Sequence, residues 1–332
     1  MYNFKKIFIL ILSLIAMLGY ISIDHAKKDV QVYSFPLATA SPEDTVTQIY
    51  ADTFSKEVYK LSKGKIKIKV YSNGTLGGDR ELLESCASGD IPFVVQNTAP
   101  QVSFMKKLSI FDLPCAFDDI ETARLKVDSP DFLSKIETVY EDSGYKLLGY
   151  ADQGFRVLST NRAIDALSDY KGLKIRTMEN PNHIKFWSSL NANPTPMSFN
   201  EVYIGLQQGT IDAQENPYEV IVSSKLYEQQ EYIIETNHLP HFISLIVNLD
   251  FYNKLSVEEQ SIIDKASYTA KIQARKASDS RIAKKIQIIK DSGTKIVQLP
   301  SDIKNEMKLK ASNIYSEIES QVGSPIYSAY LN

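Results

Sequence analysis

The sequence predicts an α/β protein built from two lobes. Three observations lead to this prediction: the chain has 332 residues, strand-like and helix-like segments alternate along it, and apolar residues make up 43% of it. That length suits two ordinary domains or one domain of two lobes. The apolar share is enough for a packed core and too high for a disordered chain. No repeat, low-complexity linker or heptad pattern interrupts the alternation.

The first predicted unit is a strand, a helix and a second strand. Residues 30–35 form the first strand, and the helix that follows has Ser41 as its N-cap, Pro42 in its first turn and Gly64 at its end. In residues 65–70 lysine alternates with isoleucine or valine, which predicts a strand with one face in water. Because such crossovers are right-handed and join parallel strands, we expect a parallel pair.

Strands and helices continue to alternate through the middle of the chain. Asp79 is placed to cap a short helix that Gly89 closes, and residues 91–95 predict a buried strand. Residues 145–160 predict two strands that join near Asp152–Gly154.

Two later segments predict helices. Ser198 and Glu201 have the spacing of a capping box, and Gly209 ends the helix that they begin. Residues 256–292 contain no glycine or proline and carry apolar residues at helical spacing, which predicts one long helix or two in tandem.

The N-terminus has the layout of an export signal. Lys5 and Lys6 precede an almost unbroken apolar run from Ile7 to Ile23. We expect residues 1–26 to be a signal peptide cleaved after Ala26 or, because the run approaches membrane-spanning length, an uncleaved anchor. Either alternative places the body of the protein outside the cytoplasmic membrane, in the periplasm.

Composition and motifs exclude several classes of function. The net charge of -3 gives no basic surface for nucleic acid. The common catalytic, metal-binding and nucleotide-binding motifs are missing from the sequence, so we expect no enzyme, no catalytic residue, no metal and no cofactor. Cys86 and Cys115 sit in apolar segments, which favours two separate core residues over a disulfide.

Three polar residues stand near the ends of predicted strands. Arg156, Arg176 and Asn216 would meet in one crevice, because open α/β sheets bind ligands at strand ends. Two guanidinium groups and a carboxamide suit a carboxylate ligand. The structural alternatives are solvent exposure for the arginines and a turn role for Asn216, which precedes Pro217. For Phe199, just before a predicted helix, the simplest interpretation is a hydrophobic staple or a core residue.

At these residues the sequence resembles the DctP family, the solute-binding proteins of TRAP transporters. Four segments carry the resemblance, in the order found in the family, and it extends over residues 30 to 320: "TLGGDRELLESCASGD", "FDLPCAF", "GLKIRTMENP" and "NANPTPMSFNEVYIGLQQGTIDAQENP". It implies a hinged, two-lobe periplasmic protein that captures a small organic acid and delivers it to a sodium-driven membrane permease.

The resemblance also implies roles for particular residues. Arg176 matches the arginine that makes the main salt bridge to the ligand carboxylate. Arg156 and Asn216 match further ligand contacts, and Phe199 matches an aromatic residue that stacks on the ligand. Two more ligand-binding candidates, Gln96 and His238, fall near positions that vary with the ligand.

In such folds the chain crosses between lobes more than once. We expect residues 30–153 and 242–281 in lobe I, residues 154–241 and 282–332 in lobe II, and the long helix across both. We also expect a monomer.

The solute is less defined than the class. A second anionic group would meet Arg156, which suggests a C4-dicarboxylate. Sugar acids and sialic acid remain open, since Gln96 and His238 are able to meet hydroxyl groups. An enzyme or a sensor on a similar two-lobe scaffold is the alternative outside the class.

Overall fold

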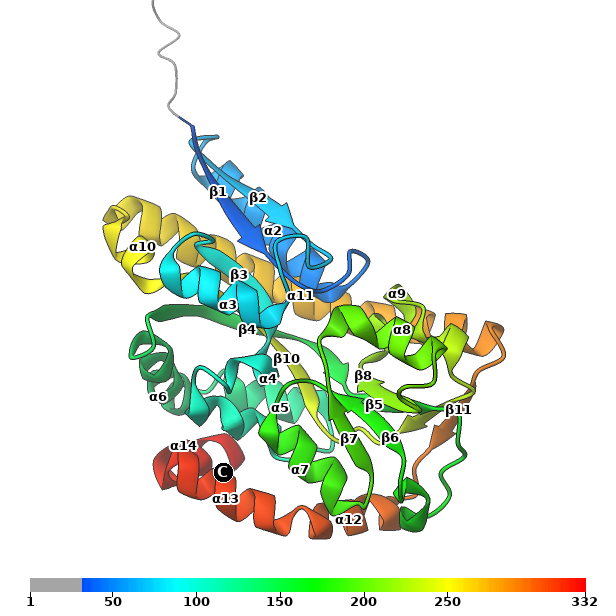
Figure 1. Cartoon of the computed structure of the whole chain (residues 1–332). Coiled ribbons are helices and arrows are strands. Elements are labelled where there is room, and N and C mark those ends of the chain that lie inside the picture. The colour runs from blue at the N-terminus through cyan, green and yellow to red at the C-terminus, as the bar shows by residue number, and fades with distance from the viewer. Residues whose placement is uncertain (1–31) are drawn as a thin grey trace, which may run out of the picture.

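The computed structural model describes residues 32–332 (Figure 1). Within them the chain forms two β-sheets with helices packed around both, so the predicted α/β fold is confirmed. The predicted export signal or anchor, residues 1–26, lies outside the described residues. Among those residues no helix is both long enough and apolar enough to cross a membrane.

The first sheet has five strands and belongs to the first lobe. In order across the sheet they are β2 (Ile66–Tyr71), β1 (Tyr33–Ala38), β3 (Phe93–Asn97), β10 (Pro240–Asn248) and β4 (Tyr145–Phe155). β1 and β2 are parallel, as predicted, whereas β10 runs antiparallel to both β3 and β4.

The second sheet has six strands and belongs to the second lobe. In order across the sheet they are β11 (Lys295–Gln298), β9 (Tyr232–Glu235), β5 (Val157–Thr160), β8 (Ala213–Asn216), β6 (Lys174–Thr177) and β7 (Asn193–Pro196). β6 is parallel to both of its neighbours, so the carboxyl ends of β6 and β8 lie at the same edge of the sheet.

Helices cover both sheets. Those of the first lobe are α2 (Val46–Leu61), α3 (Asp79–Ser88), α4 (Thr98–Gln101), α5 (Ile120–Val127), α6 (Pro130–Glu141) and α10 (Leu249–Lys254), with the 3-10 helix η1 (Lys106–Asp112). Those of the second lobe are α7 (Pro181–Ser189), α8 (Val202–Gln207) and α9 (Tyr218–Ser223), with the 3-10 helices η2 (Leu167–Tyr170), η3 (Phe199–Glu201) and η4 (Leu226–Gln229).

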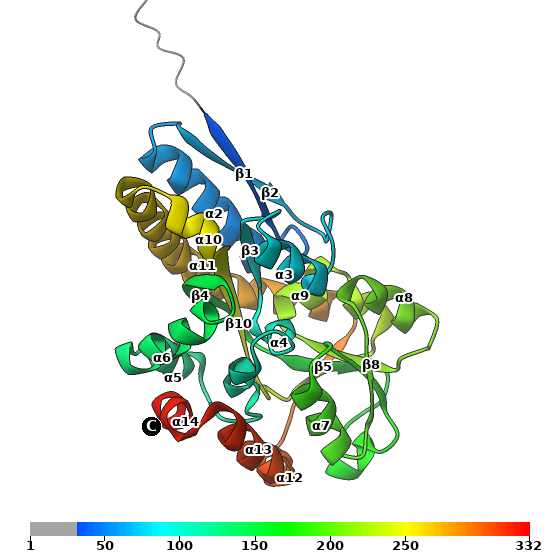
Figure 2. The same ribbon diagram turned by 60° about the vertical axis from the view of Figure 1, so that its left-hand side comes forward.

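One long helix, α11 (Val257–Asp291), contacts both lobes. It packs on α2 and β4 of the first lobe and on α9 and β11 of the second, and it runs behind both sheets in Figure 1. Figure 2 shows α2 and α11 side by side. Ser256 and Glu259 cap it through a reciprocal capping box. Of the two predicted arrangements, a single helix or two in tandem, the single helix is present.

The chain passes between the two sheets at three places. β4 continues into β5 through Arg156, β9 is followed by β10, and α11 leads into β11. The C-terminal helices α12 (Ser301–Lys310), α13 (Ser312–Val322) and α14 (Ser324–Leu331) then return along the bottom of Figure 1, and α14 packs on α5 and α6. The division of the chain into lobes by residue number stays a prediction.

Three local predictions need correction. α2 begins at Val46 with Thr45 as its N-cap, rather than at Ser41, because Ser41 and Pro42 form a loop above the cleft between the lobes. Asp79 is the first residue of α3 and Gly78 is the N-cap. The break between β4 and β5 falls at Arg156, not at Asp152–Gly154.

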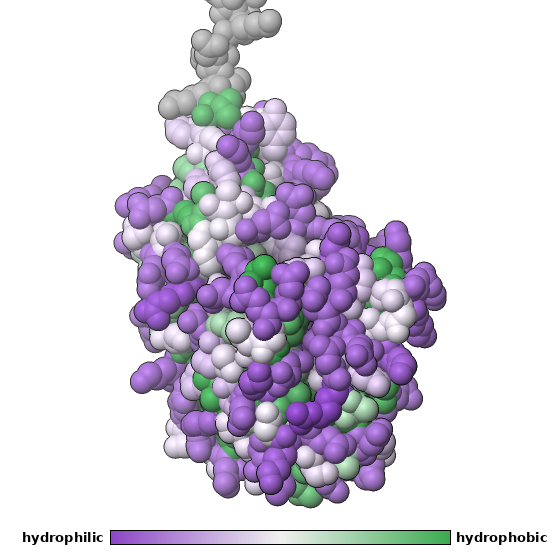
Figure 3. All heavy atoms as spheres, turned by 45° about the vertical axis from the view of Figure 1, so that its right-hand side comes forward, coloured by the Kyte–Doolittle hydropathy of each residue, from purple (hydrophilic) through white to green (hydrophobic). Residues whose placement is uncertain are grey.

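The buried side chains form three hydrophobic clusters. Cys86 and Cys115 both lie in the largest cluster as free thiols, as predicted. The surface in Figure 3 is mainly hydrophilic, with hydrophobic residues in small separate patches.

Candidate functional site

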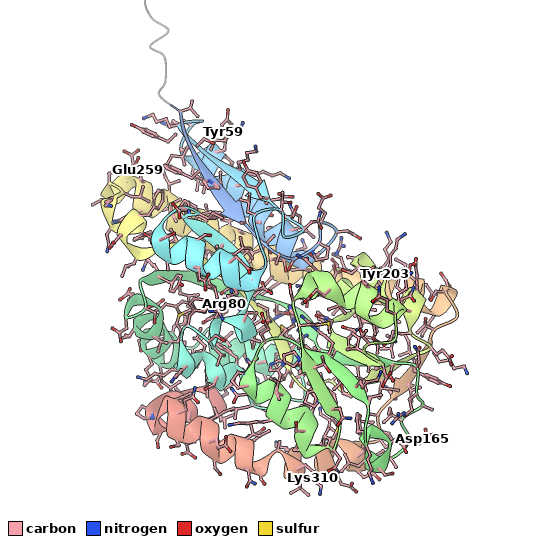
Figure 4. All side chains as sticks on the ribbon, in the orientation of Figure 1. Tyr59, Arg80, Asp165, Tyr203, Glu259 and Lys310 are labelled. Carbon is pink, nitrogen blue, oxygen red and sulfur yellow. The ribbon has the colours of Figure 1, made fainter. Side chains whose placement is uncertain are left out.

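A cleft lies between the two lobes. Its empty space is about 420 Å³, including the part open to solvent. Residues from the first lobe and residues from the second line it: Ala40, Ser41, Pro42, Asp79, Asn97, Arg176, Met178, Phe199, Asn216, Val220 and His241. A second opening adjoins it beyond Arg176 and Phe199. In Figure 4, Arg80 marks α3 on one side and Tyr203 marks α8 on the other.

Arg176 is a buried cation on the wall of this cleft. It lies in β6, where Ile175, Arg176 and Thr177 are all buried, so the exposed position that the sequence also allowed is not the one adopted. Nε and Nη2 donate to the carbonyl oxygen of Met197, at 3.1 and 2.8 Å. Among residues 32–332 no carboxylate forms a salt bridge with Arg176 and nothing accepts from Nη1. Burial lowers the pKa of Arg176 to about 10, which still leaves it charged at neutral pH.

Phe199 and Asn216 lie beside Arg176 and line the same space. Phe199 begins η3, is half-buried, and has its ring centroid 5.9 Å from Arg176 Cζ. Asn216 ends β8 and is buried, and its Nδ2 donates to Gln214 Oε1 at 2.7 Å. Arg176 and Asn216, which the sequence predicted in one crevice, therefore line the same space together with Phe199, whereas Arg156 is not among its lining residues.

Arg156 has a different environment, although it is as deeply buried. Its Nε and Nη2 donate to the two carboxylate oxygens of Glu215. Nη2 also donates to Asn216 Oδ1 at 3.2 Å, and Nη1 donates to His241 Nδ1. Arg156 is not among the residues that line the cleft. Its predicted contact with the ligand stays a prediction.

Glu215 is the centre of a buried network of charges. Burial by itself would raise the pKa of Glu215, but Arg156, His183 and His238 outweigh it and hold that pKa well below its usual range. His183 also contacts Asp112 at 3.2 Å, and the two carboxylates raise its pKa to about 9 against the effect of burial. The negative charges of Glu215 and Asp112 thus balance the positive charges of Arg156 and His183.

His238 and Gln96 are buried behind the cleft and do not line it. His238 lies against Phe186 and Trp187. Its Nε2 donates to Glu215 Oε2 at 3.1 Å because an ionised carboxylate only accepts. The side-chain amide of Gln96 has no hydrogen-bond partner within residues 32–332. Both remain predicted ligand residues.

His241 is a cleft residue that the sequence did not indicate. Arg156 can only donate, so His241 Nδ1 must accept and the ring proton is on Nε2. Burial and the charge of Arg156 hold the pKa of His241 well below its usual range, so the ring is neutral. His241 is therefore a cleft residue that has its N–H on Nε2 and its Nδ1 held by Arg156. The spacing of residues in the sequence did not predict that His183, His238 and His241 would cluster around Glu215.

Asp79 is a second cleft residue that the sequence did not indicate as a ligand residue. Its position before a predicted helix suggested only a capping role. It lines both the cleft and the second opening, and within the described chain its carboxylate has no hydrogen bond or salt bridge. Burial raises the pKa of Asp79 to about 6, against the charge of Arg176, which lowers it. Asp79 and Arg176 are thus two opposite charges without direct partners in one cleft.

The two lobes also touch beside the cleft. Asp44, in the loop before α2, accepts from Arg281 and from Lys285 Nζ at 2.7 Å, and both of these belong to α11. Arg281 also donates to Glu219 of α9 at 2.9 Å, and Ser223 Oγ donates to the Asp44 carbonyl oxygen at 2.6 Å. Residues of the long helix therefore join the two sides of the cleft. No group of three or more metal-ligating side chains occurs within residues 32–332.

The chain matches known proteins over most of its length. Residues 37–321 match the model of the DctP family, described as "Bacterial extracellular solute-binding protein, family 7". A solute-binding protein of Verminephrobacter eiseniae is 36% identical over 74% of this chain and 73% of its own. The ectoine/5-hydroxyectoine-binding periplasmic protein UehA of Ruegeria pomeroyi is 30% identical over 78% of this chain and 76% of its own. The sugar acid binding protein DctPAm of Advenella mimigardefordensis, crystallised with galactonate, has a TM-score of 0.87 at 29% identity and covers 91% of this chain and 98% of its own.

The fold and the site are those of a solute-binding protein: they combine two lobes, a long helix across both and a polar cleft between them. The chain belongs to the DctP family of TRAP transporter solute-binding proteins, whose members are receptors and not enzymes.

Proposed function

We propose that the protein captures a small organic acid in the cleft, holds its carboxylate with Arg176, and hands it to a sodium-driven TRAP permease. The observation that carries this proposal is a buried guanidinium group with no carboxylate partner among residues 32–332 and with Nη1 free of any hydrogen bond. An unpaired buried charge is costly, and a ligand carboxylate would compensate it through two parallel hydrogen bonds.

Phe199 and Asn216 complete the proposed binding site. The half-buried ring of Phe199 offers an apolar face to the ligand, and Asn216 is able to hold a polar atom of it. Ligand-bound relatives support a carboxylate, since galactonate is the ligand of the sugar acid binding protein. Arg156, Gln96 and His238 are the further residues proposed to bind the ligand, although none of them is among the residues that line the cleft.

The same proposal covers the location, the oligomeric state and the partners of the protein. The protein works in the periplasm after export by its N-terminal segment, as a monomer, and it binds no nucleic acid. The family supports the periplasm and the permease, because DctP proteins are solute-binding subunits of TRAP transporters.

A thermal-shift screen with organic acids, followed by calorimetry, tests the proposal. Arg176→Lys should weaken binding of the acid found at least 100-fold, about 2.7 kcal/mol, because lysine cannot form the planar bidentate fork. Arg162→Lys is the matched control, since Arg162 is exposed and outside the cleft, and it should bind normally. Equal affinity of Arg176→Lys and the wild type would contradict the anchor role.

A further inference from the structure

The charged residues that line the cleft can neutralise one carboxylate of the ligand but not two. In the main space Arg176 is the single cation of the lining set and Asp79 the single anion. The second opening adds the carboxylates of Glu81, Glu179 and Glu201. Its one further cation is Arg80, which is exposed and paired with Glu84 at 3.1 Å.

Arg156 does not supply a second anion site. Its guanidinium group gives Nε and Nη2 to Glu215 and Nη1 to His241. A second ligand carboxylate would therefore face Asp79 and the carboxylates of the second opening, with no further unpaired cation among the described residues that line the two spaces. Like charges in a partly dry cleft repel strongly.

Hydroxyl groups would fit the same surroundings. A ligand hydroxyl can donate to the unpartnered carboxylate of Asp79 and can accept from His241 Nε2–H, whose direction Arg156 fixes. Ser41 adds a hydroxyl to the lining. Donors and acceptors besides Arg176 are thus both present on the wall of the cleft.

A cationic group on the ligand is the competing partner for Asp79. Proteins that bind such groups usually surround them with several aromatic faces. Here the lining includes one aromatic ring besides the imidazole, that of Phe199, and it lies against Arg176, with its centroid 5.9 Å from Arg176 Cζ. The N–H of His241 also suits an oxygen atom better than a cation.

We infer that the ligand is a monocarboxylate that carries several hydroxyl groups, and that Asp79 is the residue that selects it against dicarboxylates. The inference rests on the proposed function, in which Arg176 holds the one carboxylate. Asp79 accepts from ligand hydroxyls and repels a second carboxylate of the ligand.

The experiment compares galactonate with galactarate, which has the same carbon chain with a carboxylate in place of the terminal hydroxymethyl group. Calorimetry at pH 8 should give at least tenfold tighter binding of galactonate by the wild type. Asp79→Asn removes the repulsion and should reduce that ratio below about threefold. Asp90→Asn removes an exposed carboxylate just beyond the end of α3, outside the residues that line either space, and should leave the ratio within about twofold of the wild-type value.

The outcomes separate this inference from the proposed function. Equal or tighter binding of galactarate by the wild type, or an unchanged ratio in Asp79→Asn, overturns the inference, whereas loss of both acids in Arg176→Lys would still support the anchor. Tighter binding of ectoine than of galactonate overturns it too, because Asp79 then pairs with a cation. So does a wild type that binds succinate and binds neither galactonate, gulonate nor erythronate. A wild type that binds no carboxylate at all overturns both.

Discussion

Arg156 and Arg176 are two arginines of equal burial with opposite electrostatic situations. Both are at most 2% exposed, and both belong to segments that the sequence predicts as strands. Arg156 lies in the crossing from β4 to β5 and is neutralised by Glu215. Arg176 lies in β6, and among residues 32–332 its one acceptor is the backbone carbonyl oxygen of Met197.

The difference shows what makes a buried arginine a binding group. A buried charge that already has its counter-charge stabilises a particular arrangement of the fold and has little left to offer a ligand. A buried charge without one keeps a large unmet interaction that a ligand anion can satisfy. Burial alone does not distinguish a structural arginine from a ligand-binding one. The presence or absence of a carboxylate partner does.

The largest effect should appear when the paired arginine loses its partner. Glu215→Ala leaves the charge of Arg156 buried and uncompensated, and should lower the free energy of unfolding of the ligand-free protein by about 3–5 kcal/mol. Arg176→Met should change it by less than about 1.5 kcal/mol, because losing the hydrogen bonds to Met197 is offset by removing an unpaired buried charge. Urea unfolding followed by circular dichroism measures both.

Glu215→Gln serves as a second variant with nearly the same shape. It should destabilise the protein less than Glu215→Ala and more than Arg176→Met. If Arg176→Met costs as much stability as Glu215→Ala, the contrast between the two arginines is wrong and Arg176 is a structural residue.

A smaller effect should follow from changing the neighbours of Arg176. Phe199→Ala and Asn216→Ala should each weaken ligand binding at least tenfold, about 1.4 kcal/mol. Loss of a phenylalanine from a packed core would cost about 3–5 kcal/mol of stability. Because Phe199 is half-buried in the ligand-free cleft, its replacement should cost much less. Asn216→Ala should cost about 1–3 kcal/mol, because it removes the buried hydrogen bonds to Gln214 and Arg156.

Denaturant melts of the ligand-free variants beside calorimetric titrations decide this prediction. Phe186→Ala, which removes a fully packed ring next to His238, provides the reference for a core effect. Large destabilisation of Phe199→Ala with normal affinity in the folded fraction would make Phe199 a core residue.

The smallest effect concerns the charge of Asp79 and its pH dependence. Burial raises its pKa to about 6 in the folded protein, above the value of about 3.9 for an unfolded aspartate, with Glu179 and Glu81 acting in the same direction and Arg176 and Arg156 against it. A raised pKa favours the folded state at low pH, and this contribution is lost as the pH rises through 6.

Asp79→Asn should therefore melt higher than the wild type at pH 8, by on the order of 1–2 °C, with the difference shrinking toward pH 5. The preference for galactonate over galactarate should also shrink toward pH 5, where Asp79 is protonated. Differential scanning calorimetry across this pH range measures the first effect, and a pH-independent difference in melting temperature would argue against a raised pKa.

The order of helices and strands could be predicted from the sequence because short-range patterns carry it. The alternation of residues 65–70 gave β2, and the run without glycine or proline gave α11. Helix starts were less certain, since Ser41 and Thr45 are both good caps and only packing against the cleft loop selects Thr45. The resemblance to the DctP family predicted six ligand residues, of which Arg176, Phe199 and Asn216 line the cleft and Arg156, Gln96 and His238 do not.

The sequence by itself determined the α/β class, the long helix, the family and the residues around Arg176, because these depend on local periodicity and on contiguous motifs. Only the tertiary structure decided that Glu215 neutralises Arg156, that Arg156 fixes the ring proton of His241, and that Asp79 faces the cleft. Glu215 lies 59 residues from Arg156, and His241 lies 85 residues from it. The net charge that a ligand encounters in the cleft depends on pairs of residues that are far apart in the sequence. Local sequence patterns do not show which residues pair.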